Sequence, residues 1–398
     1  MSELSVPGIR LGVAQAGIKY PNRDDLTLIE MSEDSATAAV FTQNTFRAAP
    51  VLVAERNNEV ISARYILINS GNANAGTGEP CMVACEQSCS ALSELTHISP
   101  TEVLPFSTGV IGEVLPVDAL NAALPAAISD LGSNNWERAA QAIMTTDTVP
   151  KLRSKVVTIN NGTACQLVGM SKGSGMIQPN MATMLGFIAT DAVISREMLD
   201  GMLRTAVNVS FNRITVDGDT STNDAVTLTA TGQSDFVISP TDREAALAFQ
   251  AALTELATEL AQDIIRDGEG ATKFVEITVS NAGSEAEADQ VARTVAHSPL
   301  VKTALFASDP NWGRILAAVG RAGVSDLNVD AVSLSLNGVL IAENGARAAS
   351  YTEEAGVAAM APEDLIISID LGRGEKSATL WTTDFSYDYV KINAEYRT

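Results

Sequence analysis

Residues 172–185, KGSGMIQPNMATML, are the part of the sequence that is hardest to explain by a purely structural role. Gly173 and Gly175 free the backbone, and Pro179-Asn180 marks a turn. The chain then passes through small residues to Ala182-Thr183. Glycines and a turn ahead of a threonine allow a strained, exposed peptide bond. The spacing alone leaves two alternatives open, a reactive threonine or an ordinary loop.

Strands and helices alternate on both sides of this stretch. Residues 156–159 and 164–168 flank Asn161-Gly162, a pair that predicts a hairpin with a two-residue turn. A second such pair, Asn337-Gly338, predicts another hairpin in the last third of the chain. Ser195 is expected to begin a helix that places several apolar residues on one face. These are Met198, Leu199, Met202, Leu203 and Ala206.

The clearest helix is predicted to begin at Thr241. Thr241 and Glu244 match a capping box, and apolar residues recur at helical spacing up to Ile264, so the helix should end near Asp267-Gly268. Further strands are expected at 65–68, 274–279 and 365–370. Hairpins among alternating strands and helices predict an α/β fold in which helices are layered on mixed β-sheets.

Charge and composition exclude several classes of function. The 398 residues include 48 acidic and 26 basic ones, giving a net charge of −22, which disfavours binding to nucleic acid or to an anionic membrane surface. Hydrophobic residues make up 46% of the chain, enough for a sizeable packed core. No apolar run reaches 18 residues and no secretory signal is visible, so we expect a cytoplasmic protein.

The four cysteines do not form a disulfide scaffold. Cys81, Cys85 and Cys89 lie four residues apart, which places them on one stripe of a helix. A metal site would need a fourth ligand and a loop spacing. We therefore expect a buried packing face and no metal.

Histidine is scarce, since His97 and His297 are the two in the whole chain. A mechanism that depends on a histidine base or on a histidine-rich metal site has almost nothing to use. Any nucleophile in this protein must obtain its base elsewhere.

The sequence resembles the ornithine acetyltransferase family of bacterial arginine biosynthesis, whose members cleave themselves before a threonine. The resemblance covers the whole chain and includes 172–185 as the nucleophile signature. Six further segments match in order: 69–78, Ser107-Thr108-Gly109-Val110-Ile111-Gly112, Thr145-Thr146-Asp147-Thr148 before Pro150-Lys151, 267–273 (DGEGATK), 309–314 (DPNWGR) and 393–398.

This resemblance implies cleavage between Ala182 and Thr183, and a fold shared with self-processing aminopeptidases that use an N-terminal nucleophile. An alpha chain of residues 1–182 and a beta chain of residues 183–398 would result. The beta chain would begin with the nucleophile, Thr183. Its own α-amine, with an unperturbed pKa near 8, would then serve as the base that histidine does not supply.

The resemblance also implies the other site residues. Thr108, through its side chain, and Gly109, through its backbone N–H, would stabilise the oxyanion. Charge complementarity suggests Lys172 for a substrate carboxylate and Glu269 for the ammonium of ornithine. The implied substrate contacts are Thr145, Lys172, Thr183, Glu269, Asn393 and the terminal Thr398.

The implied reaction moves an acetyl group from N2-acetylornithine to glutamate through an acetyl-threonine intermediate. Some members of the family also acetylate glutamate from acetyl-CoA, and the residues leave open whether this protein does. No step needs a cofactor, with acetyl-CoA entering only as a co-substrate. The family implies an assembly of two alpha and two beta chains, or a multiple of it.

Two other functions remain possible on the sequence alone. A self-processing aminopeptidase or amidase of similar fold would pass its acyl group to water instead of glutamate. A non-enzymatic acidic binding protein would fit the charge and the absence of a histidine triad. Glu269 and the 393–398 tail favour the transferase over the aminopeptidase or amidase, and the Thr183→Ala variant would separate the enzymes from the binding protein.

Overall fold

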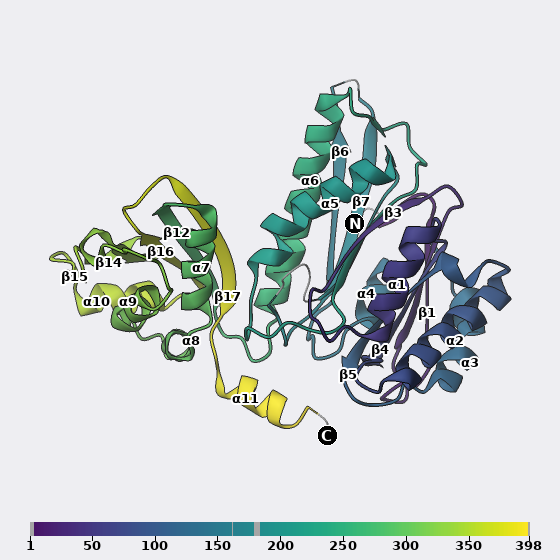
Figure 1. The fold of residues 1–398 in the computed structure, drawn as a ribbon, viewed down its shortest axis with the longest axis horizontal. Coiled ribbons are helices and arrows are strands. Elements are labelled where there is room, and N and C mark those ends of the chain that lie inside the picture. The colour runs from purple at the N-terminus through teal and green to yellow at the C-terminus, as the bar shows by residue number, and fades with distance from the viewer. Residues whose placement is uncertain (1–3, 161, 179–183, 397–398) are drawn as a thin grey trace. The chain divides into compact units, whose positions relative to one another are not determined.

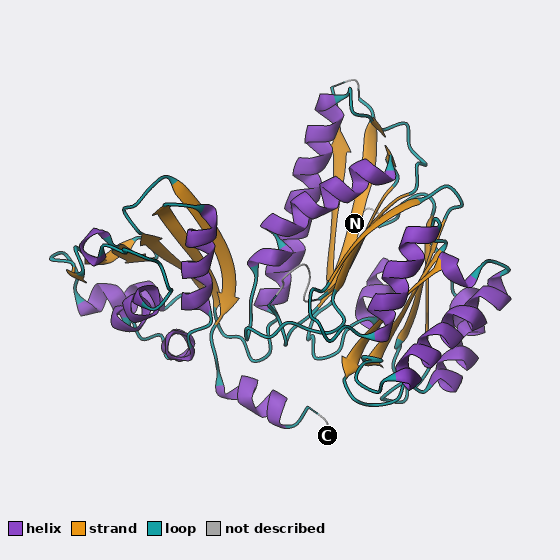
Figure 2. Cartoon of the chain, in the orientation of Figure 1, coloured by secondary structure: helices purple, strands orange, loops and turns teal. Residues whose placement is uncertain are grey.

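The computed structural model describes residues 4–160, 162–178 and 184–396. These form two compact units. Unit 1 comprises Met1–Gly173, Gln178–Asn212 and Asp219–Ile264, and unit 2 comprises Ser174–Ile177, Arg213–Gly218 and Ile265–Thr398. Mixed sheets layered with helices make up both units, so the predicted α/β class is confirmed (Figure 1 and Figure 2).

Unit 1 contains two larger sheets, each covered by helices (Figure 1). The first sheet has the order β1-β2-β4-β5, in which β4 and β5 are parallel and the other neighbours antiparallel. Its strands are β1 (Ile9–Ala14), β2 (Leu26–Met31), β4 (Tyr65–Asn72) and β5 (Val103–Val110), and its helices are α1 (Ala49–Val60), α2 (Glu79–Thr96), α3 (Val117–Ser129) and α4 (Trp136–Ala142).

Strand β4 shows why this sheet is buried on both faces. Successive side chains of a strand point to opposite faces. Ile66 and Ile68 join a core that includes Trp136 of α4, whereas Tyr65 and Leu67 join a core on the other face that includes the cysteines of α2. The apolar run predicted at 65–68 is therefore a strand between two layers.

The second sheet has the order β3-β10-β8-β7-β6. Helices α5 (Arg196–Val209) and α6 (Arg243–Arg266) pack on this sheet. Leu256 and Leu260 of α6 lie so close to Gly169 of the sheet that a Cβ at that position would lie 2.8 and 3.0 Å from them. The strands are β3 (Ala36–Phe41), β6 (Lys151–Thr158), β7 (Ala164–Lys172), β8 (Leu185–Thr190) and β10 (Ala225–Ala230), with β9 (Val193–Ile194) and β11 (Val237–Ile238) as a separate pair.

Unit 2 is built on one sheet of order β15-β14-β13-β16-β12-β17. Its strands are β12 (Phe274–Ala282), β13 (Ser333–Leu336), β14 (Val339–Glu343), β15 (Ala346–Arg347), β16 (Asp364–Asp370) and β17 (Lys376–Thr383). Its helices are α7 (Glu285–Ala296), α8 (Pro299–Phe306), α9 (Trp312–Gly320), α10 (Glu353–Met360) and α11 (Tyr387–Ala394).

Both predicted hairpins are present, but the two-residue turn predicted for the first is wrong. Strands β6 and β7 pair antiparallel, and Ile159 N donates to Thr163 O at 3.1 Å, so three residues, 160–162, separate the paired ends. Asn161 of the predicted turn lies outside the described residues. Strands β13 and β14 meet at Asn337 and Gly338, whose φ angles of 45° and 78° are the positive values that a tight hairpin turn requires.

The two predicted helix starts have different outcomes. Ser195 caps α5, accepting a hydrogen bond from Met198 N. The start predicted at Thr241 is wrong, because α6 begins at Arg243 and the carboxylate of Asp242 accepts the hydrogen bond from Ala245 N at 3.1 Å. The end of α6 at Arg266 agrees with the prediction.

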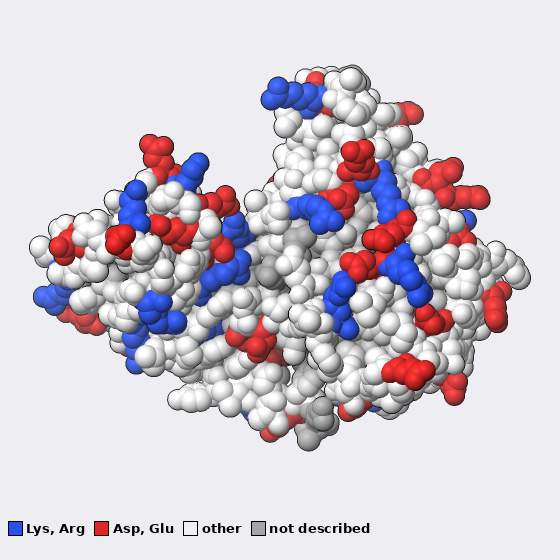
Figure 3. Space-filling model, in the orientation of Figure 1, with Lys and Arg blue, Asp and Glu red and all other residues white. Residues whose placement is uncertain are grey.

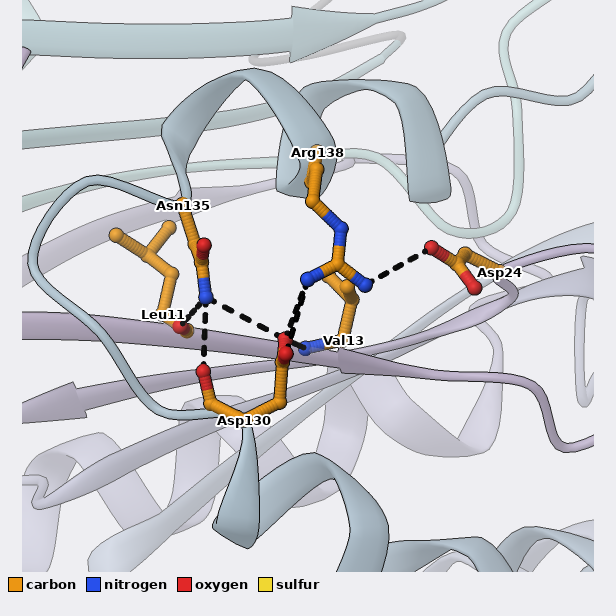
Figure 4. Close-up of polar contacts among 6 residues, drawn as sticks. All are labelled: Leu11, Val13, Asp24, Asp130, Asn135 and Arg138. Carbon is orange, nitrogen blue, oxygen red and sulfur yellow. Dashed lines mark hydrogen bonds and ion pairs between the residues drawn. The ribbon is translucent and has the colours of Figure 1, made fainter.

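Side chains from the α3–α4 connection cover the open edge of β1 (Figure 4). Asp130 Oδ2 accepts a hydrogen bond from Val13 N at 2.9 Å, and Asn135 Nδ2 donates to Leu11 O at 2.9 Å. Arg138 of α4 holds Asp130 in place at 2.9 Å. The outward backbone groups Val13 N and Leu11 O of this edge strand therefore have intramolecular partners, which disfavours pairing with another chain.

The packing face predicted for the cysteines is confirmed, since Cys81, Cys85 and Cys89 are buried in the core between α2 and the first sheet. Within the described residues, no helix has the length and apolar character needed to span a bilayer. On the face drawn in Figure 3, basic and acidic side chains lie close to one another. Ion pairs of unit 1 include Arg47–Glu55 and Arg204–Asp200, at 2.8 and 2.7 Å.

Candidate active site

Lys172 and Thr108 lie together in the interior of unit 1. Lys172 ends β7 and Thr108 lies near the end of β5, and the two residues are only 9% and 8% exposed. The ammonium Nζ of Lys172 donates a hydrogen bond to Thr108 Oγ1 at 3.1 Å. Because a lysine ammonium can only donate, the hydroxyl hydrogen of Thr108 remains able to donate to another group.

Gly109, next to Thr108, occupies a backbone conformation that other residues rarely adopt. Its φ is 136°, and a Cβ at this position would lie 2.2 Å from the carbonyl carbon of Gly71 on the neighbouring strand β4. The β4–β5 register shifts at this point. A glycine is therefore required here, and it sets the direction of the chain just after the Thr108 hydroxyl.

Asp147 links Thr145 to the end of β7. Its carboxylate accepts hydrogen bonds from Thr145 N at 3.0 Å, Gly173 N at 2.7 Å and Lys151 Nζ at 2.7 Å. Burial opposes ionisation of Asp147, but the charges of Lys172 and Lys151 and these hydrogen bonds outweigh it, so the pKa lies well below its usual range. The Asp147 carboxylate thus interacts with two of the predicted substrate residues, with Thr145 through a hydrogen bond and with Lys172 through its charge.

A cavity of about 640 Å³ opens beside Thr145. Its wall is polar and includes Gln15, Arg23, Gln141, Asp147 and Thr148. Arg23 is held toward this wall by a hydrogen bond from its guanidinium to Met144 O at 2.6 Å. The volume and the polar wall suit a small amino-acid ligand.

Residues 223–225 connect these parts of unit 1. Asn223 Nδ2 donates hydrogen bonds to two carbonyls, Ala73 O at 2.6 Å and Ser107 O at 3.0 Å. Ser107 directly precedes Thr108 in sequence. Ala225 N donates to Met184 O at 2.9 Å. Asp224 lies between them and is buried.

Glu269 and Asn393 lie together in unit 2. Asn393 Nδ2, on α11, donates a hydrogen bond to Glu269 Oε2 at 2.8 Å. A second bond from the same amide, to Tyr389 O at 3.0 Å, fixes the orientation of Asn393 on its helix. Glu269 is buried and has a carboxylate suited to an ammonium ligand.

The glycine-rich part of the stretch 172–185 is anchored beside Glu269 within unit 2. Glu269 N donates to Ser174 O at 2.9 Å, and Ser174 Oγ donates to Asp267 O at 2.6 Å. A Cβ on Gly175 would lie 2.3 Å from the Glu269 carboxylate. Because glycine has no side chain, Gly175 leaves room for this carboxylate.

The structure thus groups the predicted residues within each unit. Thr108, Gly109, Thr145 and Lys172 belong to unit 1, and Glu269 and Asn393 to unit 2. Ala182, Thr183 and Thr398 lie outside the described residues. Among residues 4–160, 162–178 and 184–396, no group of three or more His, Cys, Asp or Glu is arranged to hold a metal ion.

Residues 10–398 match the ArgJ family. The arginine biosynthesis bifunctional protein ArgJ of Pseudomonas syringae pv. tomato is 55% identical over 397 residues, covering 99% of this chain and 97% of that protein. The protein of the same name from Methylococcus capsulatus is 54% identical over 393 residues, covering 99% and 96%. The structure of Mycobacterium tuberculosis ornithine acetyltransferase complexed with ornithine is 33% identical, with a TM-score of 0.39, covering 46% of this chain and 98% of that one.

The extent and level of these sequence matches confirm the family and the class of activity predicted from the sequence, an acyltransferase of arginine biosynthesis. The chain belongs to the ArgJ family.

Proposed function

We propose that the protein is a bifunctional acetyltransferase. It moves an acetyl group from N2-acetylornithine to glutamate, and it also forms N-acetylglutamate from acetyl-CoA. The observation that carries this proposal is the buried hydrogen bond between Lys172 and Thr108, since it prepares a hydroxyl donor for an oxyanion. The name "bifunctional" carried by the relatives and the ornithine bound to the Mycobacterium tuberculosis protein support the two activities.

The proposed nucleophile is generated by self-cleavage. Thr183 Oγ attacks the carbonyl carbon of Ala182, the peptide C–N bond breaks, and the acyl group moves from nitrogen to oxygen. Water then hydrolyses the ester and leaves a carboxylate on Ala182 and an α-amine on Thr183. The products are the alpha chain, residues 1–182, and the beta chain, residues 183–398.

Acetyl transfer follows in two half-reactions. The α-amine of Thr183 accepts the hydroxyl proton while Oγ attacks the acetyl carbonyl of N2-acetylornithine. The tetrahedral intermediate collapses, ornithine leaves with the proton on its amine, and Thr183 carries the acetyl group as an ester. The amine of glutamate attacks this ester and restores the hydroxyl.

Both half-reactions pass through a tetrahedral oxyanion. We assign its stabilisation to the hydroxyl of Thr108 and the backbone N–H of Gly109. The hydrogen bond from Lys172 to Thr108 Oγ1 draws electron density from the hydroxyl, and so strengthens the hydrogen bond that this hydroxyl donates.

The proposed substrate contacts are the residues that the family resemblance implies. Thr145, Lys172 and Thr183 contact the substrate, and Lys172 is suited to its carboxylate. Glu269, held by Asn393, is suited to the ammonium at the far end of ornithine. The terminal Thr398 completes the proposed set of contacts.

The proposal extends to partners and location. The cleaved chains form an assembly of two alpha and two beta chains, or a multiple of it, in the cytoplasm. The substrates are small molecules, and acetyl-CoA enters as a co-substrate. No organic cofactor is needed for any of the steps above.

Intact-mass measurement tests the cleavage. The active wild-type protein should give two chains that separate at Ala182–Thr183, and Thr183→Ala should give one chain without turnover. An active sample that consists of a single 41.7 kDa chain would refute the proposal. Assays with N2-acetylornithine or acetyl-CoA, with and without glutamate, test the transfer. Acetate release that is independent of glutamate would instead indicate a hydrolase.

A further inference from the structure

Arg23 belongs to the loop of residues 15–25, which connects β1 to β2 in unit 1. The loop is fixed by its own contacts, because the buried carboxylate of Asp25 accepts hydrogen bonds from Ala16 N and Ile18 N, both at 2.6 Å. Each oxygen of Asp25 therefore binds a backbone N–H group. A loop organised in this way holds Arg23 in a defined place before any ligand binds.

The guanidinium of Arg23 lies next to the backbone of Thr145. Its Nη2 donates a hydrogen bond to Met144 O at 2.6 Å, and Met144 directly precedes Thr145 in sequence. Arg23 and Thr145 both line the cavity of about 640 Å³. A guanidinium carries five N–H donors, and Arg23 uses one of them within residues 4–160, 162–178 and 184–396. The other donors are available to a ligand.

The charges on the cavity wall favour an anionic ligand. The charged residues described on this wall are Arg23, Asp24 and Asp147. Both acids have a cationic partner, since Asp24 pairs with Arg138 at 3.4 Å (Figure 4) and Asp147 pairs with Lys151 at 2.7 Å. In the part of the chain that the structure describes, Arg23 forms no ion pair with a carboxylate. The uncompensated charge of the wall is thus positive.

The proposed reaction leaves one substrate group without a partner. Glutamate carries two carboxylates, whereas N2-acetylornithine carries one carboxylate and loses its acetyl group to leave ornithine, which has an ammonium at its far end. Lys172 is suited to one carboxylate and Glu269 to that ammonium. The second carboxylate of glutamate cannot pair with Glu269, because like charges repel. Binding of glutamate therefore needs a further cation.

We propose that Arg23 binds the side-chain carboxylate of glutamate in the cavity beside Thr145, and so determines the specificity for this acetyl acceptor. The inference rests on the proposed function, because it concerns the second half-reaction. The planar fork of a guanidinium can donate to both oxygens of a carboxylate at once. N2-acetylornithine has no second carboxylate, so the first half-reaction does not need Arg23.

Arg23→Met tests this role, since methionine is unbranched but has neither the charge nor the donors. The KM for glutamate should rise about tenfold or more, because a hydrogen-bonded charge pair is lost. The rate of ornithine release from N2-acetylornithine, measured in a single turnover without glutamate, should stay at the wild-type value. Arg23→Lys keeps the charge without the fork and should show a smaller rise in the KM for glutamate. This second variant keeps the test valid if Arg23→Met does not fold.

Glutamine as the acetyl acceptor separates binding of the carboxylate from support of the loop. It has the size of glutamate but a neutral amide at its end. Arg23→Met should lower kcat/KM for glutamate and change kcat/KM for glutamine little, so the preference of the wild type for glutamate should shrink. An equal loss with both acceptors would overturn the proposal. So would a rise in KM confined to acetyl-CoA, or an equal rise for N2-acetylornithine, which would indicate a phosphate or the shared carboxylate as the ligand.

Arg64 supplies a matched control in unit 1. It is also partly buried and donates to a backbone carbonyl, Met31 O, at 3.1 Å, but it is not among the residues described on the cavity wall. Arg64→Met should leave the KM values for glutamate and N2-acetylornithine as in the wild type. If the wild type transfers acetyl groups to glutamate and Arg23→Met has the same KM for it, the role of Arg23 is refuted. Absence of transfer in the wild type would instead refute the proposed function.

Discussion

Lys172 Nζ lies 3.1 Å from Thr108 Oγ1, although the two residues are 64 positions apart in sequence and belong to different sheets of unit 1. Both side chains are buried, so the hydrogen bond operates where water competes little. The lysine charge polarises the Thr108 hydroxyl, so this hydroxyl can donate a stronger hydrogen bond to an acceptor.

Replacing Lys172 with methionine should therefore reduce acetyl transfer. Lys172→Met keeps the length of the side chain but removes the donor and the charge. We expect kcat/KM to fall about 100-fold, the lower end of the effect seen when one oxyanion donor is lost. Steady-state kinetics with N2-acetylornithine and glutamate, on protein whose mass confirms cleavage, measure this.

Lys155 supplies the control for this variant. It lies on β6 and forms ion pairs with Glu255 and Glu259 at the surface of α6. Lys155→Met should leave kcat/KM close to the wild-type value. If Lys172→Met behaves in the same way, Lys172 has no part in catalysis.

Gly175 gives a prediction about substrate binding. In Gly175→Ala the new methyl group would lie 2.3 Å from the Glu269 carboxylate, which is the end of a flexible side chain and can move away. That movement breaks the 2.8 Å hydrogen bond from Asn393. A hydrogen bond to a charged group contributes about 1.5–3 kcal/mol, so KM for N2-acetylornithine should rise at least about tenfold.

The free energy of unfolding should fall by about 1.5–3 kcal/mol in Gly175→Ala, because the folded protein loses this hydrogen bond to the Glu269 carboxylate. Urea denaturation measures this beside the kinetics. Gly313→Ala on α9 is the matched control, since the nearest atom to its Cβ would be 3.8 Å away. An unchanged KM in Gly175→Ala would contradict a role for Glu269 in binding ornithine.

His297 should make stability depend on pH. Burial and the nearby charges of Arg293, Lys302 and Arg321 lower the pKa of His297 to about 4. The folded protein therefore binds this proton less readily than the unfolded chain, whose histidine has a pKa near 6.5. The contribution of His297 to stability is present above about pH 6.5 and is lost as the pH falls toward 4.

Urea midpoints measured between pH 4 and pH 7.5 test this prediction. His297→Gln should remove part of the decline seen in the wild type below pH 6.5. The exposed His97, replaced by asparagine because its φ is 58°, is the control and should leave the decline in place. Identical curves for His297→Gln and the wild type would rule out His297 as the cause.

Local elements could be predicted from the sequence where a few neighbouring residues determine them. The pair Asn337-Gly338 forms its turn because the required positive φ angles are available to these residue types. The start of α6 could not be predicted in the same way. Glu244, expected to cap its own helix, instead accepts a hydrogen bond from Asn160 N at 3.1 Å, a residue 84 positions earlier. Long-range contacts of this kind leave no local pattern.

The same distinction holds for the site. Thr108, Thr145 and Lys172 were predicted by family resemblance, and the structure brings them into one region of unit 1 through Asp147 and the ends of β5 and β7. Asn223 lies in none of the matched segments. Its hydrogen bonds to Ala73 O and Ser107 O join residues more than 100 positions apart, which leaves no local pattern in the sequence.

The order of strands in the second sheet determines how the cleaved protein should behave. Strands β3, β6 and β7 precede Thr183 in sequence, whereas β8 and β10 follow it. In the sheet order β3-β10-β8-β7-β6, the two later strands lie between β3 and β7. The alpha and beta chains would therefore share backbone hydrogen bonds along both sides of the β8–β10 pair.

We accordingly predict that cleavage does not release the chains. Separating them requires the β3–β10 and β7–β8 ladders to break and exposes the apolar core that includes Phe106 and Phe187, so separation should coincide with global unfolding. Denaturing mass spectrometry should show two chains, and native mass spectrometry should show both in every complex. Raising the salt concentration to 1 M screens surface ion pairs but leaves ladders and apolar contacts in place, so it should not release either chain. Dissociation in native buffer, or at a urea concentration below the unfolding transition, would show that the interleaved strands do not hold the chains together.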